Sequence, residues 1–280
     1  MRLGAARFVA GETLDDCVPV LRSLNERGFH ANTTLLGEDV HEEAQTAAVV
    51  DEYLGILDRL HAERLRANVA LKLTHLGLDV AEELALTNVR RIVERAAELR
   101  NFVRIDMESS AAVDPTLRIF RSLREAGLDN VGTVLQSYLH RTPADLEALL
   151  PLRPNLRLVK GAYLEPPEIA YPRKEDVDAA YMRLVERSLC GEGYTAIATH
   201  DERMIEHAIA FAEREGVGRD RFELQMLYGV RPHLQAALVA RGFKVLVATP
   251  FGPEWFPFFV RRLAERPANL GFVVRNLVRR

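Results

Sequence analysis

The chain has 280 residues, of which 48% are hydrophobic and 28% are charged, and its formal net charge is −3. A chain of this length holds one large barrel or two smaller domains. Because the two signs of charge nearly balance, the chain as a whole lacks the basic field typical of proteins that bind nucleic acid.

The sequence contains no signal that would place the protein inside or across a membrane. No uninterrupted apolar stretch reaches the ~18 to 20 residues needed to span a bilayer, and the N-terminus lacks the apolar core of a signal peptide. Cys17 and Cys190 are far apart and fit no metal-ligand spacing, which suits two free thiols in a reducing compartment. We therefore expect a cytoplasmic protein, or one bound peripherally at the inner face of the cell membrane.

In chain order, the first predicted element is a helix over residues 12–27, with Pro19 as a candidate interruption. From residue 29 onward, short β-branched runs alternate with segments of helical period. The predicted strands are 29–37, 68–77, 101–108, 130–137, 155–163, 194–200, 221–227 and 243–250. The predicted helices between and after them are about 40–64, 81–99, 115–125, 143–150, 175–190, 202–214, 231–240 and a last one from about 254.

Helix-boundary residues support this division of the chain. Gly127, Gly216 and Gly242 stand where predicted helices stop, and Asp114 and Thr142 each precede a proline, as an N-cap residue would. Strict alternation of strands and helices indicates parallel strands, and eight such units indicate a closed barrel. The sequence thus predicts an α/β protein with the (β/α)8 TIM-type fold. It forms a single domain over residues 1–280, with an N-terminal helical extension in 1–28 and the barrel in 29–280.

Active sites of such barrels form at the C-terminal ends of the strands, where this sequence places many polar residues. In VRIDMES, Arg104, Asp106 and Glu108 alternate with apolar residues, so a strand would place all three charges on one face. Two interpretations of these charges stay open: a structural Arg104–Asp106 ion pair at the barrel mouth, or a catalytic role for these residues.

Two lysines belong to the same set of predicted strand ends. Lys72 lies in the apolar segment ALKLTHLG, where its ammonium requires a carboxylate partner from the protein or from a ligand. LVKGAY ends a strand with Lys160, Gly161 and Tyr163, in which the glycine permits close backbone approach and the tyrosine offers a flat apolar face.

Two histidines, His75 and His200, lie near predicted strand ends without a second ligand at metal-binding spacing. This favours hydrogen-bonded core histidines, and we predict no metal site.

After the last predicted strand, Arg261 and Arg262 stand side by side, and Glu265 lies one helical turn further on. Two guanidiniums with one nearby acid have donors left for the carboxylate or phosphate of a ligand. A solvated helix face is the other interpretation of this pair.

Eight segments in barrel order resemble the proline dehydrogenase family, FAD-dependent barrel enzymes that oxidise L-proline to Δ1-pyrroline-5-carboxylate. The segments are TLLGEDV, ALKLTHLG, RIDMES, VLQSYLHRT, RLVKGAY, ATHD, FELQMLYG and FFVRRLAERPAN, the last of which is similar to the family's R-R-x-x-E motif. The resemblance implies FAD as cofactor, hydride transfer from proline C5 to flavin N5, and a quinone at a membrane surface as electron acceptor.

The resemblance also implies how substrate is held. Lys72, Arg261 and Arg262 match the residues that hold the proline carboxylate, and Tyr163 matches one that packs beside the pyrrolidine ring. Glu38 matches an acid that closes over the substrate through an ion pair with Arg261.

Catalytic and cofactor positions follow from the same resemblance. Asp106 and Arg157 match positions near the reacting centre, with Arg157 close to flavin N5. The positions that match FAD contacts are Met107, Gln136, Lys160, Gly161, Ala162, Thr199 and His200.

One position departs from the family pattern. Ala248 stands where the family usually has a tyrosine against the substrate, which implies weaker proline binding or looser substrate choice. From the residues alone, two other functions stay open: a Schiff-base aldolase-type barrel using Lys72 or Lys160, and a non-catalytic barrel that serves as a binding module. The sequence leaves the oligomeric state open.

Overall fold

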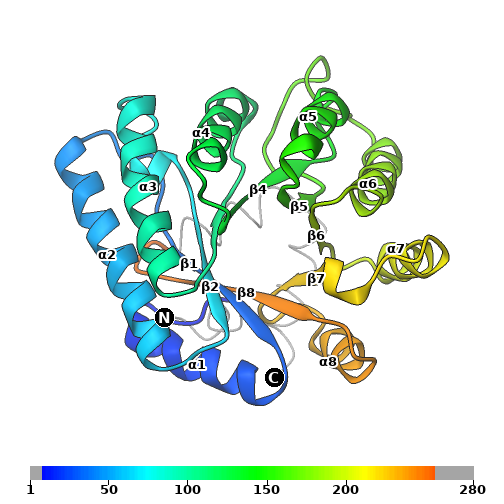
Figure 1. The fold of residues 1–280 in the computed structure, drawn as a ribbon, viewed down its shortest axis with the longest axis horizontal. Helices are drawn as coiled ribbons and strands as arrows, with labels where there is room; N and C mark the ends of the chain where they lie inside the picture. Colours follow the sequence, from blue (N-terminus) through cyan, green and yellow to red (C-terminus); the bar gives the residue numbers. More distant parts are fainter. Residues whose placement is uncertain (1–7, 256–280) are drawn as a thin grey trace, which may run out of the picture.

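In a computed structural model, which describes residues 8–255, the strands close into a parallel barrel (Figure 1). Each strand pairs with the next one along the chain, and β8 closes the barrel by pairing in parallel with β1. The strands are β1 (His30–Leu35), β2 (Ala67–Leu71), β3 (Val103–Ile105), β4 (Val131–Gln136), β5 (Asn155–Val159), β6 (Tyr194–Ala198), β7 (Phe222–Leu227) and β8 (Val245–Phe251). This topology confirms the predicted TIM-type barrel.

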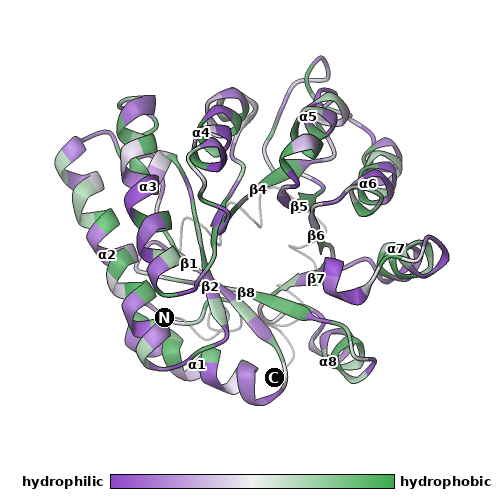
Figure 2. Ribbon diagram, in the orientation of Figure 1, coloured by the Kyte–Doolittle hydropathy of each residue, from purple (hydrophilic) through white to green (hydrophobic). Residues whose placement is uncertain are grey.

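The helices form a layer around the barrel, with α2 to α8 each following one strand (Figure 1). The α-helices are α1 (Leu14–Glu26), α2 (Glu43–Ala62), α3 (Glu82–Glu98), α4 (Val113–Glu125), α5 (Thr142–Leu149), α6 (Lys174–Leu189), α7 (Glu202–Arg214) and α8 (Pro232–Ala240). Short 3-10 helices are η2 (Thr74–Leu76), η3 (Ser110–Ala112), η4 (Leu150–Leu152) and η5 (Arg219–Arg221). Hydrophobic and hydrophilic positions alternate along α2, α3 and α4 (Figure 2), as expected for helices with one face on a core.

Helix α1 covers the outside of the wall that β1 and β8 share. Thr13 and Asp16 form a capping box at its start, and the helix continues through Pro19 without interruption. Cys17 lies on the buried face of this helix, with its Sγ 3.5 Å from the hydroxyl oxygen of Thr33 on β1. Within the described part of the chain, α1 thus packs against the outside of the barrel.

Strand and helix ends differ from the predicted ones at several places. β2 ends at Leu71 and β3 at Ile105, because the chain turns into η2 and η3 soon after these residues. Helix α4 begins at Val113 and α5 at Thr142, so neither Asp114 nor Thr142 is the N-cap residue that we predicted.

Three predicted helix stops are confirmed. Gly127, Gly216 and Gly242 have φ angles of 80°, 69° and 82°, the left-handed conformation in which glycine commonly ends a helix.

The predicted last helix, with Arg261, Arg262 and Glu265, lies outside the described residues. Within residues 8–255, no helix is long and apolar enough to cross a bilayer.

Candidate active site

Arg157 is the centre of a hydrogen-bonded cluster inside the barrel. It projects from β5 and is 9% exposed. Its Nε donates to Gln225 Oε1 at 2.6 Å, Nη1 to Asp106 Oδ1 at 2.6 Å, and Nη2 to Asn32 Oδ1 at 2.9 Å. Three acceptors from three other strands or strand ends therefore fix the plane of a permanently charged guanidinium.

Arg104 does not pair with Asp106, so the structural pair that we considered is wrong. Its guanidinium donates to the carbonyl oxygens of Thr133 at 2.9 Å and Asn155 at 2.7 Å. Burial lowers the pKa of Arg104, and the nearby charge of Arg157 acts in the same direction. Arg104 thus braces β4 and β5, while Asp106 serves Arg157.

Glu108 also departs from the predicted alternation, because β3 ends three residues before it. Its carboxylate accepts from the backbone N of Thr74 at 3.1 Å and from the Thr74 hydroxyl at 2.6 Å. Burial raises the pKa of Glu108. This carboxylate ties η2 to the end of β3 and does not join the Arg157 cluster.

The carboxylate partner expected for Lys72 is Glu38, which follows β1. The two side chains form an ion pair and are 20% and 14% exposed. His75 lies close by, and a Cβ at Gly37 would come within 2.4 Å of its ring, so only glycine fits at that position. The pair brings together two of the predicted substrate and gate residues at adjacent strand ends.

The residues expected to contact FAD lie at the ends of β3, β4, β5 and β6. Lys160 forms an ion pair with Asp178 of α6 at 2.6 Å, and His200 Nε2 accepts a hydrogen bond from the backbone N of Leu227 at 2.8 Å. Met107 and Thr199 are buried, and Ala162 is exposed. His200 therefore has the satisfied role that we predicted for an isolated histidine.

Gln136 is buried at the end of β4 with one polar atom unsatisfied. Its Nε2 donates to the carbonyl oxygen of Glu108 at 3.1 Å, whereas its Oε1 accepts no hydrogen bond from any residue in the described part of the chain. Such an orphaned acceptor is costly unless another group donates to it.

Gly161 keeps the backbone after β5 close to a tyrosine. Its φ angle is 112°, and a Cβ there would lie 2.2 Å from the ring of Tyr138. A side chain at this position would push the turn away from Tyr138, which explains the glycine before Tyr163.

Sequence reasoning assigned no role to four residues that shape the site: Asn32, Gln225, Asp178 and Glu165. The first two are polar residues within apolar strands, and that pattern was the available signal. Glu165 accepts from the backbone N and hydroxyl of Ser110 at 2.7 and 2.6 Å, and so clasps the loop after β5 to the end of β3. No sequence pattern in the segments after β3 and β5 indicates these two hydrogen bonds between Glu165 and Ser110.

The described residues contain no group of three or more His, Cys, Asp or Glu side chains placed to hold a metal ion. The predicted carboxylate clamp can be described only at Lys72, because Arg261 and Arg262 lie beyond residue 255.

Comparisons with known proteins match nearly the whole chain. The sequence model of the family "Proline dehydrogenase" matches residues 17–275. The chain is 44% identical to the proline dehydrogenase of Deinococcus radiodurans over 279 residues, covering 98% of this chain and 90% of that protein. It is 39% identical to proline dehydrogenase 1 of Bacillus subtilis strain 168, covering 100% and 92% of the two chains.

The fold matches solved structures of larger proteins. Proline utilization A from Bdellovibrio bacteriovorus superposes with a TM-score of 0.87 at 24% identity, over 93% of this chain and 32% of that one. Proline utilization A from Corynebacterium freiburgense gives a TM-score of 0.81 at 24% identity, over 99% and 32% of the two chains. This chain thus spans about a third of the length of either.

Proposed function

The chain belongs to the proline dehydrogenase family and oxidises proline in proline catabolism, and we propose that it does so with FAD held at the C-terminal ends of β3 to β6. The family is generally flavin-dependent. The product is Δ1-pyrroline-5-carboxylate, and the catalytic residues are Asp106 and Arg157.

The observation that supports a flavin at this site is the unsatisfied Gln136 Oε1 at the end of β4, and the family resemblance indicates FAD as that flavin. A flavin ring offers an N–H between carbonyl oxygens, so an amide that presents a buried acceptor suits its edge. Lys160 and Arg157 add positive charge near the same strand ends. The remaining contacts of our proposal are Met107, Gly161, Ala162, Thr199 and His200.

The chain's own residues hold and orient the reactants. Lys72, Arg261 and Arg262 bind the proline carboxylate, Tyr163 packs beside the ring, and Glu38 closes over the substrate. Their charge-assisted hydrogen bonds fix the carboxylate, and thereby the position of C5.

Arg157 supplies fixed charge next to the reacting atoms, and its Asp106 contact keeps it in place before substrate arrives. A preorganised cation of this kind stabilises developing negative charge without reorganisation during the reaction. When bound, FAD supplies the group that accepts hydride from proline C5 after the amine has lost its proton.

We further propose that a quinone accepts the electrons, through peripheral contact with a membrane. The support is a set of exposed apolar side chains on loops at the same end of the barrel as the site. Val80 follows β2, and Leu164 and Ile169 follow β5, with exposures of 42%, 95% and 37%. Apolar side chains at a site entrance suit an apolar electron acceptor.

The Schiff-base alternative fits the site poorly. A nucleophilic lysine needs an amino group that is free to attack a carbonyl carbon, whereas Lys72 and Lys160 each form an ion pair with a carboxylate. Membership of the family disfavours both this alternative and a non-catalytic barrel.

The cofactor is tested by releasing it from purified protein with acid and identifying it by chromatography. We expect FAD, and we expect anaerobic proline to bleach its visible absorption. FMN as the released flavin, or protein that stays colourless after incubation with FAD, would refute the proposal.

The carboxylate clamp is tested with Arg262→Met, which should raise the KM for proline at least ~tenfold, since a charge-assisted pair contributes about 1.5 to 3 kcal/mol. Arg183→Met on α6 is the control, because this exposed arginine lies away from the site. An unchanged KM in the first variant would remove Arg262 from the clamp.

A further inference from the structure

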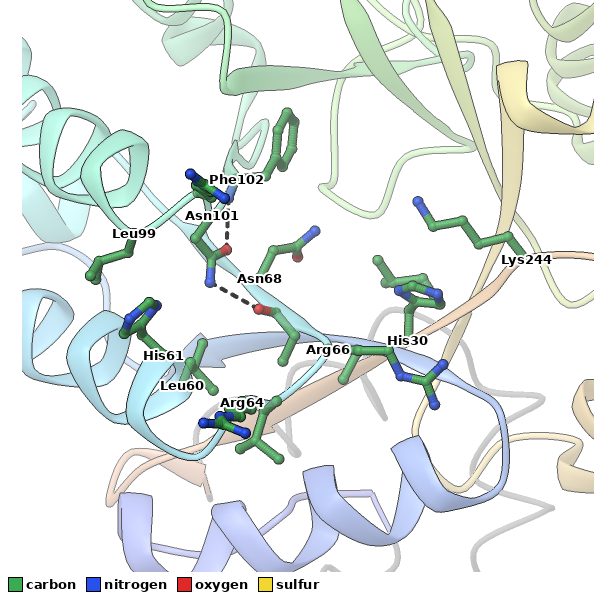
Figure 3. A pocket seen from close by; sticks show the side chains of 15 residues that line it. His30, Leu60, His61, Arg64, Arg66, Asn68, Leu99, Asn101, Phe102 and Lys244 are labelled. Carbon is green, nitrogen blue, oxygen red and sulfur yellow. Dashed lines mark hydrogen bonds between the residues drawn. The ribbon is translucent and has the colours of Figure 1, made fainter.

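A polar cavity of about 450 Å³ lies at the N-terminal end of the barrel, opposite the proposed active site. Its walls come from the beginnings of β1, β2, β3 and β8 and from the turns that follow α2 and α3. Figure 3 shows Asn68 and Asn101 near its middle, with Lys244, Arg66, Arg64 and His61 placed around them. We call this space the basal cavity.

Every ionisable side chain that lines the basal cavity is basic, and no Asp or Glu is among its described lining residues. The six basic residues are His30, His61, Arg64, Arg66, Arg100 and Lys244. Four of them are lysine or arginine, in a chain whose net charge is −3. The basal cavity therefore has a local excess of positive charge, although the protein as a whole has a negative net charge.

Little of this charge is neutralised within residues 8–255. Arg64 and Arg100 form no ion pair there, and the Arg66 guanidinium donates to the carbonyl oxygen of Asn25. Lys244 has a partner, the buried Glu223, at 2.8 Å. Burial lowers the pKa of His30, and the nearby charges of Lys244 and Arg66 lower it as well, whereas Glu223 acts in the opposite direction.

The backbone at two of these arginines is also unusual. Arg64 and Arg100 follow the C-caps of α2 and α3 with φ angles of 52° and 54°. The equivalent positions after α4, α7 and α8 are glycines, which adopt this conformation without the cost of about 1 kcal/mol that a side chain brings. The two helix ends that border the basal cavity thus carry an arginine where glycine would be easier.

Electrostatic attraction to the helix C-termini does not explain the presence of all six basic residues in the basal cavity. Each terminus has a partial charge of about −0.5, which favours one nearby cation. Arg66 and Lys244 precede strands, and His30 begins β1, so these three groups gain nothing comparable.

We propose that the basal cavity binds a small polyanion, chemically a linear diphosphate or triphosphate. Guanidinium groups bind phosphate oxygens in pairs, and cations spread around a cavity suit a chain of phosphates better than one compact ion. The site is separate from the proline site, and neither its ligand nor its test depends on FAD.

The test measures binding of inorganic tripolyphosphate and orthophosphate by titration calorimetry at low ionic strength. The main variant is Arg64→Gly/Arg100→Gly, which removes both side chains and leaves the backbone conformation that glycine prefers. The matched control is Arg153→Gly, since Arg153 also has a positive φ angle, 47°, and does not line the basal cavity.

We expect the unaltered protein and the control to bind tripolyphosphate equally, and at least tenfold more tightly than orthophosphate. The double variant should bind tripolyphosphate at least tenfold more weakly, with circular dichroism confirming that it is folded. Absence of binding to the unaltered protein, equal affinity in the double variant, or no preference over orthophosphate would each overturn the proposal.

Discussion

Ala248 is the residue at which we expect a substitution to change the affinity for substrate. It pairs in register with Asn32, whose side chain reaches Arg157 inside the barrel. Paired residues on neighbouring strands point to the same side of the sheet, so the Ala248 methyl also faces the lumen. A larger side chain at 248 would therefore add a wall next to the Arg157 cluster.

Replacing Ala248 with Tyr should increase kcat/KM for proline about tenfold, chiefly through KM, because an aromatic face would pack against the substrate ring. Steady-state kinetics with proline and a dye acceptor would measure this. Ala248→Ser is the control for a change that adds no ring. If the tyrosine variant gains nothing, the methyl at 248 does not limit affinity.

We predict that His75 makes the protein sensitive to acid. It is 7% exposed, its Nδ1 has no hydrogen-bond partner among residues 8–255, and burial lowers its pKa to about 4. The charge of Lys72 is the second cause of this shift. The folded state thus keeps His75 neutral, whereas the unfolded chain takes up a proton near pH 6.5.

His75 therefore contributes stability above pH 6.5 that is lost as the pH falls to 4. Between these pH values the free energy of unfolding should decrease in both proteins. The decrease in His75→Leu should be smaller, by about 2 to 3 kcal/mol, than the decrease in the unaltered protein. Urea unfolding at pH 7 and pH 4 would measure it, with the exposed His233→Leu as control. If the free energy of unfolding decreases equally in all three proteins, groups other than His75 cause the acid sensitivity.

For strands and helices, the sequence predicts the presence of an element better than the residue at which the element ends. All eight predicted strands are present, because each is an apolar β-branched run between helical segments. The end of β3 was wrong by three residues: the strand ends at Ile105, the Asp106 carboxylate bonds to Arg157, and the Glu108 carboxylate bonds to Thr74. Tertiary hydrogen bonds decide such ends, and the local pattern does not contain them.

The loop between β5 and α6 shows the same dependence on tertiary contacts. Glu165 holds it through two hydrogen bonds to Ser110, while its neighbour Leu164 is 95% exposed. Tyr163 precedes this pair, so the clasp sets how the loop lies over the proposed substrate site. The loop should loosen without this carboxylate.

Replacing Glu165 with Ala should raise the KM for proline about threefold to tenfold, while Tm changes little, because two hydrogen bonds of a surface loop are lost and the core is untouched. Limited proteolysis should cut the variant faster near Leu164. Glu168→Ala, an exposed acid of the same loop, is the control. Unchanged KM and cleavage rate would show that the clasp does not order the loop.

Across the whole molecule, a chain of polar contacts runs through the barrel from the basal cavity to the proposed active site. Lys244 pairs with Glu223 at 2.8 Å, and Gln225 Nε2 donates to Glu223 Oε1 at 2.5 Å. Gln225 Oε1 then accepts from Arg157, which binds Asp106. Arg157 could be assigned from the family resemblance, but its partners depend on which side chains of non-adjacent strands meet in the lumen, and one sequence does not specify that.

We therefore predict that Gln225 is a positioning residue that acts through Arg157. Gln225→Leu keeps the side-chain size and leaves Arg157 Nε without its acceptor, so we expect kcat to fall ~tenfold to 100-fold, from the loss of about 1.5 to 3 kcal/mol of a charged hydrogen bond. The KM for proline should change less than threefold, because the proposed contact of Lys72 with the proline carboxylate is not altered.

The matched control is Gln235→Leu, because Gln235 is equally buried and donates to the carbonyl oxygens of Leu227 and Val230, without contact to Arg157. This variant should lose stability and retain kcat. A purely structural role for Gln225 predicts the same outcome for both variants, whereas a role in placing Arg157 predicts that only Gln225→Leu lowers kcat. Stopped-flow measurement of flavin reduction by proline separates the two, since it follows the step that Arg157 serves.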